Sequence, residues 1–140
     1  MMIDSLLTYL LSPNLPLSAL VGGRVQPVPA PDDISDYPCI VFQSASYVEE
    51  YDDSGSVGLA KERIVFDCMA TDTSTEGGFG VSRAIAFALR SALSGFGPAY
   101  LPDNTYVELI TIVNIVGGWN DAARTIYKTS VHAMVQYQIQ

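Results

Sequence analysis

The clearest periodic pattern in the sequence is the alternation of apolar and other side chains over residues 60–70, AKERIVFDCMA. Ile64, Phe66 and Cys68 fall on one face of an extended chain. Alternation of this kind is typical of a β-strand with one face on a hydrophobic core. We therefore predict a long strand at this position, with these three side chains packed beneath a helix.

Two segments have apolar residues at helical spacing. Leucines and an isoleucine form one stripe over residues 2–12, and Pro13 follows directly, which predicts a first helix that ends there. A second stripe of valine, isoleucine, leucine and alanine begins near Phe79, and Gly95 lies at its end. The sequence therefore predicts two helices, one at the N-terminus and one after the long strand.

The remaining strands are predicted around these helices. Residues 24–28 predict an edge strand or an extended arm, because the prolines here cannot donate ladder hydrogen bonds. Residues 38–46 predict the partner of the long strand. Residues 47–58 are polar and acidic, which predicts a loop that projects or is mobile. Residues 106–116 are apolar on both faces, as in a central or doubly covered strand, and residues 125–139 alternate.

The predicted order is α-β-β-β-α-β-β. Strands follow one another and helices do not alternate with them, which favours an α+β fold over an α/β fold. We predict a largely antiparallel, four- to five-stranded sheet packed against two helices. With 140 residues and neither a repeat nor a linker, residues 1–140 are predicted to form a single domain.

Charge is the next constraint on function. Seven basic residues stand against fifteen acidic ones, for a net charge of −8, which speaks against a protein that grips nucleic-acid phosphates. No lysine or arginine lies between Arg24 and Lys61. This interval holds seven acids: Asp32, Asp33, Asp36, Glu49, Glu50, Asp52 and Asp53. They are either solvated loop residues or an acidic surface that meets a basic partner or repels a polyanion.

No motif in the sequence indicates catalysis, so we predict that the protein is not an enzyme and binds no cofactor or metal. The glycines of residues 77–80 open a helix but have no lysine after them, and His132 has no partner nucleophile in sequence. Cys39 and Cys68 lack metal-ligand spacing and are interpreted as small buried residues. The acids of residues 49–53 lack the ligand spacing of a calcium loop.

Membrane association is not predicted. The apolar N-terminal run contains an acid and has no basic residue before it, unlike a signal peptide. No stretch approaches the ~20 apolar residues of a membrane helix. We therefore expect a soluble product of the cytoplasm.

Three parts of the chain together resemble a known family. The first is residues 20–33, LVGGRVQPVPAPDD, continuing into residues 37–46, YPCIVFQSAS; the second is residues 58–72, GLAKERIVFDCMATD, followed by a helix ending in ALRSALSGFG at residues 88–97. The third is YKTSVHAMVQYQI at residues 127–139. In this order and spacing they resemble the tail completion or head–tail joining proteins of phages and prophages, which are related to tail terminators.

The resemblance implies a structural role without catalytic residues. Such subunits form homo-oligomeric rings, commonly hexamers, at the head-proximal end of the tail and join the tail to the head. The implied partners are the tail tube protein and the head–tail connector, with DNA passing through without sequence-specific binding. The implied location is the tail or neck of the virion, after synthesis in the cytoplasm of a bacterial host. Two alternatives stay open: a neck adaptor on the head side, and a small acidic binding module for a basic protein.

If the chain forms a ring, two sets of residues become candidates for its contacts. We predict that the seven acids face the channel or a basic partner ring. Five other residues are candidate subunit contacts because they lie on faces turned away from the predicted core: Arg63, Asp67, Arg83, Phe87 and Arg90.

Overall fold

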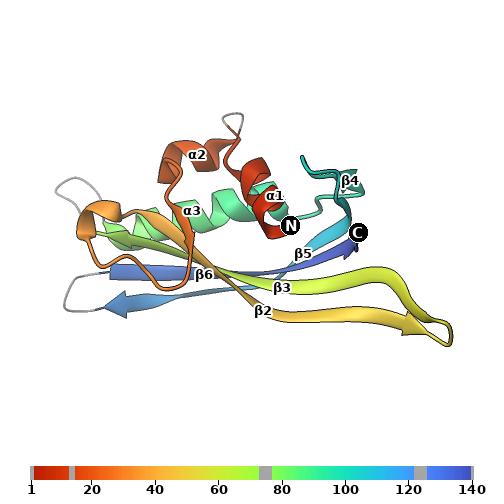
Figure 1. Cartoon of the computed structure of the whole chain (residues 1–140). Helices are drawn as coiled ribbons and strands as arrows, with labels where there is room; N and C mark the ends of the chain where they lie inside the picture. Colours follow the sequence, from red (N-terminus) through yellow and green to blue (C-terminus); the bar gives the residue numbers. More distant parts are fainter. Residues whose placement is uncertain (1, 13–14, 73–76, 122–125, 140) are drawn as a thin grey trace.

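The protein consists of one curved sheet with its helices on one face (Figure 1). The computed structural model describes residues 2–12, 15–72, 77–121 and 126–139. Within these residues, six strands form the sheet, in the order β1-β2-β3-β6-β5-β4. The opposite face of the sheet has no helix layer (Figure 1).

Among the described residues, three α-helices lie on one face of the sheet (Figure 1). Helix α1 spans Met2–Leu10, α2 spans Pro16–Val21 and α3 spans Gly78–Leu93. The helix predicted at the N-terminus is α1 and the helix predicted after the long strand is α3, so both predictions are confirmed. We had not predicted α2, a single short helix with proline at its first turn and Gly22 at its C-cap, where φ is 58°.

The start of α3 depends on a glycine that lies against the sheet. The carboxylate of Asp72 accepts a hydrogen bond of 2.8 Å from the Gly78 N–H and so satisfies one of the free donors of the first turn. A Cβ atom at Gly78 would lie 2.7 Å from the backbone of Thr71 and 2.8 Å from the ring of Tyr127. The glycine therefore weakens the helix locally but allows it to approach β3 and β6 closely.

The strands differ greatly in length. Their bounds are β1 Val25–Pro27, β2 Cys39–Asp52, β3 Gly55–Thr71, β4 Ala99–Tyr100, β5 Tyr106–Asp121 and β6 Ile126–Gln138. Strand β1 pairs parallel with β2, and every other neighbouring pair is antiparallel. A short 3₁₀ helix, η1, spans Ile34–Asp36 between β1 and β2.

The predicted α+β class is correct, whereas the predicted element count is wrong. Among the described residues, the sheet has six strands instead of four or five, and three α-helices replace two. The sheet is largely antiparallel, as predicted, but the parallel pairing of β1 with β2 makes it mixed. The order is α-α-β-β-β-α-β-β-β, with η1 after the first strand. The additional elements, α2 and β4, have six and two residues, too few for a periodic pattern to appear in the sequence.

The core lies between the helices and the upper face of the sheet. Ile64, Phe66 and Cys68 of β3 are at most 1% exposed, as predicted, and belong to the same apolar cluster as Ile85 and Leu89 of α3. Leucines of α1 and α2 complete this cluster. The predicted orientation of the long strand is therefore confirmed.

A second, smaller apolar cluster lies on the opposite face of the sheet. It joins Tyr37, Cys39, Val41, Met69 and Ile126. The proline-rich segment after β1 contributes to it, since Ala30 packs against this cluster and the Tyr37 hydroxyl donates a 2.9 Å hydrogen bond to the Pro31 carbonyl. Both cysteines are free and buried, as interpreted from the sequence, and burial raises the pKa of each thiol.

The predicted loop over residues 47–58 is instead the outer part of the β2–β3 hairpin, which we call the hairpin arm. Asp52 pairs with Gly55 across a two-residue turn, where Gly55 has φ of 120°. The pairing of β3 with β6 ends at Leu59, so the arm has no other strand beside it and projects beyond the body of the molecule (Figure 1). The predicted projection of this segment agrees with the structure, whereas the prediction of a loop is wrong. Both faces of the arm are solvated, so the alternation of apolar and polar residues that marks a strand is missing.

The prediction of a central or doubly covered strand at residues 106–116 is also wrong. Strand β4 pairs with only two residues of β5, Tyr106 and Val107, so most of β5 forms an edge of the sheet. Leu109, Val113 and Val116 are 39%, 47% and 49% exposed. Exposed apolar side chains along the edge of a sheet are typical of a site where another protein chain binds.

Candidate partner-binding surfaces

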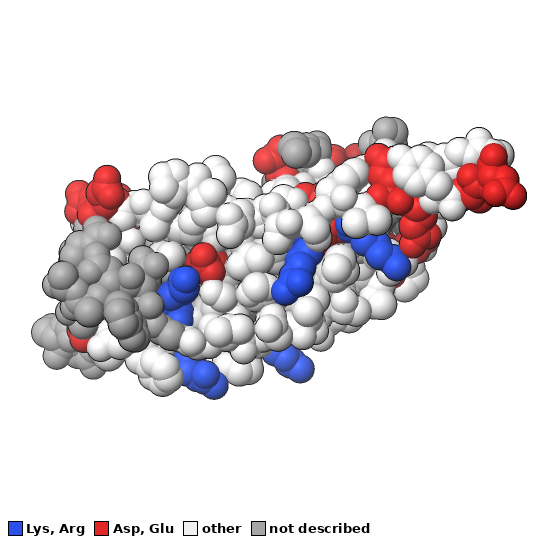
Figure 2. Space-filling view, turned by 90° about the horizontal axis from the view of Figure 1, so that it is seen from below, with Lys and Arg blue, Asp and Glu red and all other residues white. Residues whose placement is uncertain are grey.

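The seven acids of the base-free interval lie at two separate places. Asp32, Asp33 and Asp36 lie in the segment around η1, whereas the other four lie in the hairpin arm at the far end of the molecule (Figure 1). Viewed from the sheet side, acidic side chains gather at the projecting end and basic ones are spread over the middle (Figure 2). The seven acids therefore form two separate groups on the surface, although they lie in one interval of the sequence.

The hairpin arm is held together by bonds within itself. Glu49 accepts hydrogen bonds from the hydroxyls of Tyr47, at 2.8 Å, and Tyr51, at 3.1 Å, and these bonds raise the pKa of both phenols. Asp52 accepts bonds from the N–H and hydroxyl of Ser54, which lower the pKa of its carboxyl. These contacts order the arm while leaving its outer surface free for a partner.

The arm also exposes large apolar side chains. Tyr47, Val48, Tyr51 and Val57 are 47%, 57%, 68% and 42% exposed. In addition, Glu50 forms an ion pair of 3.4 Å with Lys61 at the base of the arm. Tyrosine rings attract cationic side chains through their faces, and acids attract them through charge.

The acids near η1 are also solvated. Asp33 accepts a 3.0 Å hydrogen bond from the Ser35 N–H, which lowers the pKa of its carboxyl. This is a local turn contact and points to no ligand. The group lies at the end of the molecule opposite the hairpin arm (Figure 1).

Of the predicted subunit contacts, Arg63 and Asp67 lie on the helix-free face of β3, as predicted. The Arg63 guanidinium lies 2.9 Å from Nδ1 of His132, and Asp67 accepts a 2.5 Å hydrogen bond from the Ser130 hydroxyl. Burial and the nearby arginine lower the pKa of His132. These side chains order the uncovered face by cross-strand contacts, whether or not a second copy contacts them.

Arg83, Phe87 and Arg90 are exposed on the outer face of α3, as predicted. The Arg83 guanidinium lies 5.2 Å from the ring centre of Phe87 and 5.8 Å from that of Phe79, which is 51% exposed. We call Phe79, Arg83, Phe87 and Arg90 the helix stripe. Phe79 was not predicted, although its spacing of four residues from Arg83 and eight from Phe87 could have revealed it.

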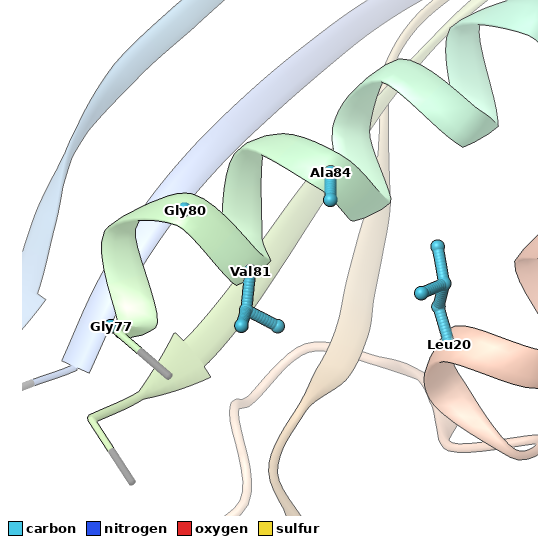
Figure 3. Close-up of a pocket in the computed structure, with 5 residues that line it drawn as sticks. All are labelled: Leu20, Gly77, Gly80, Val81 and Ala84. Carbon is cyan, nitrogen blue, oxygen red and sulfur yellow. The ribbon is translucent and has the colours of Figure 1, made fainter. Parts of the chain in front are cut away.

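An apolar hollow of about 370 Å³ lies beside the helix stripe. Leu20 of α2 faces α3 across it, and the α3 side is formed by Gly77, Gly80, Val81 and Ala84 (Figure 3). The small residues on the α3 side leave the space open. The described residues that line the hollow carry no charge, so their surface suits an apolar or aromatic group.

The described residues carry no sign of chemistry at these surfaces. They include no group of three or more histidine, cysteine or acidic side chains placed to hold a metal ion. None of the helices among them has the length and hydrophobicity needed to span a bilayer.

Comparison with known proteins decides the family. The family model for "Tail completion protein gp17" matches residues 5–137, almost the whole chain. The chain belongs to the tail completion protein family. It is thus a phage virion component with a structural role and not an enzyme, as the resemblance implied.

Two further comparisons concern the sequence and the fold of this tail completion protein. No curated protein sequence matches the chain. A solved chain from "Virion of native gene transfer agent (GTA) particle" has the same fold, with a TM-score of 0.72 and 17% sequence identity. The alignment covers 94% of this chain and 91% of that one, so the fold is shared over nearly its whole length.

Proposed function

We propose that this tail completion protein forms a ring at the head-proximal end of a phage tail, where it terminates the tail tube and joins the tail to the head. The observation that carries the proposal is the family match over residues 5–137. The partners are the tail tube protein on one side and connector proteins on the other, and we expect a hexamer.

The surfaces of the molecule support assembly with other chains. Among the described residues, the outer edge of β5 has no backbone partner beyond Ile110, which bonds to Gly95 and Phe96, and Val113 and Val116 beyond it are exposed. The outer edge of β2 has no strand beside it beyond Phe42. Unpaired edges accept strands of another chain, which gives heterologous contacts of the kind that close into rings.

The charge of the chain supports passage of DNA without binding. A net charge of −8 repels phosphates, so a channel lined by such subunits lets DNA slide. We propose that at least one of the two acidic groups, at η1 or on the hairpin arm, faces the channel or a basic partner ring. Arg63 and Asp67 remain proposed subunit contacts on the helix-free face.

The experiment is electron microscopy of tail tubes made with and without this protein. We expect a ring at one end of each tube and uniform tube length when the protein is present. Without it, the tubes lack the terminal ring and vary in length. Tubes of uniform length that bind no ring would contradict the proposal.

The same experiment separates the two alternatives. A neck adaptor on the head side would bind purified connectors and leave tube length unchanged. An acidic module for a basic protein would bind its partner as a monomer and would add no ring to either structure.

A further inference from the structure

We propose that the hairpin arm of one copy docks on the helix stripe of the next copy. This proposal rests on the proposed ring. It adds which two surfaces of neighbouring subunits touch, which ring formation alone does not specify. It assigns the acidic arm a basic partner within the same protein.

The helix stripe is a cationic and aromatic surface without a counter-ion in its own helix. Helix α3 contains Arg83 and Arg90 but no acidic residue. Among the described residues, neither arginine forms an ion pair, and the guanidinium of Arg83 lies between two phenylalanine rings. Arginine and aromatic side chains are enriched among the interface residues that contribute most of the binding free energy.

The hairpin arm is complementary to this stripe in both charge and side-chain type. Its twelve residues, 47–58, contain four acids and no basic residue. Its exposed tyrosines can stack on the stripe's rings and guanidinium groups, and the most exposed of them, Tyr51, is 68% exposed. The apolar hollow beside the stripe offers space for such a ring.

The two surfaces cannot meet within one chain. The arm extends from the sheet at one end of the molecule, away from the layer of helices, while the stripe begins at Phe79 near the other end (Figure 1). A contact between them must therefore join two copies. Because it pairs two different surfaces, it is heterologous, and repetition of it gives a ring or a filament.

The test reverses the charges of the arm in one variant and those of the helix stripe in another, and then mixes the two variants. The arm variant Glu50→Lys/Asp53→Lys reverses two charges but keeps Glu49 and Asp52, whose hydrogen bonds order the arm. The helix variant is Arg83→Glu/Arg90→Glu. The control, Asp4→Lys, reverses one exposed charge on α1, outside the surfaces to which binding has been assigned.

Sedimentation velocity over a range of protein concentrations and salt measures self-association. We expect each variant alone to associate at least ~10-fold more weakly than the wild type, because like charges then face each other, and we expect the control to associate normally. A 1:1 mixture of the arm and helix variants restores association, since each reversed arm then meets a reversed stripe. High salt weakens the wild-type assembly.

Three results would overturn the docking contact: variants that associate like the wild type, a mixture that does not restore association, or a wild type that stays monomeric at its solubility limit. None of these touches the proposed function by itself. A monomer or a variant that still adds a terminal ring to tail tubes would leave that function standing and locate the subunit contact elsewhere.

Discussion

The inner and outer parts of the β2–β3 hairpin have the same ladder of backbone hydrogen bonds but opposite surroundings. In the inner part, Phe66 is 1% exposed beneath the helices, whereas in the hairpin arm Tyr51 is 68% exposed. The pairing of β2 with β3 continues through both parts, but only the inner part has β6 beside it, and burial differs as well. The inner part stabilises the subunit, and the arm leaves its side chains free for another molecule.

The largest expected effect of this difference is on stability. Phe66→Ala is expected to lower the free energy of unfolding by about 3–5 kcal/mol, because it empties a buried site. Tyr51→Ala removes an exposed ring and should change it by less than ~0.5 kcal/mol. Urea unfolding measures both. A loss below ~1 kcal/mol for Phe66→Ala would mean that the inner part is not the core.

A smaller effect is expected where the two parts meet. The buried carboxylate of Glu62 accepts hydrogen bonds from the hydroxyls of Ser44, at 2.7 Å, and Tyr137, at 2.9 Å. Tyr137→Phe leaves this carboxylate with one donor fewer and should cost about 1–3 kcal/mol in urea unfolding. The matched control is Tyr47→Phe, which removes an exposed bond to Glu49 and should cost less than ~0.5 kcal/mol. Equal losses would show that burial does not distinguish the two bonds.

The smallest expected effect is a pH dependence on the helix-free face. The pKa of His132 lies below its usual 6.5, first through burial and then through Arg63, with Asp67 opposing. The unfolded chain then binds a proton before the folded chain does, so stability should fall as pH drops below about 6.5, by at most ~1.4 kcal/mol per pH unit.

Urea unfolding at pH 7.5 and pH 5.5 tests this dependence. His132→Gln removes the titrating group, so the variant should lose less stability than the wild type between the two conditions. An equal loss in both proteins would assign the effect to other groups.

Most of the body could be predicted because its signals are local. The alternation around Phe66, the stripe of α3 and the proline-limited strand β1 each depend on a few neighbouring residues, and all three agree with the structure. The candidate surfaces were predicted less completely. Arg83, Phe87 and Arg90 lie on the outer face of α3 as expected, whereas Phe79 and the exposed edge of β5 were missed.

The sequence by itself determined which face of β3 and of α3 is buried and that the chain is acidic without catalytic motifs, because side-chain periodicity and composition need no knowledge of distant contacts. The family resemblance was also present in the sequence. The tertiary structure decided which strands are neighbours, and therefore that β5 is an edge, that residues 47–58 project as a hairpin and that the seven acids divide into two groups. These properties depend on pairing between residues far apart in the chain, which no local pattern encodes.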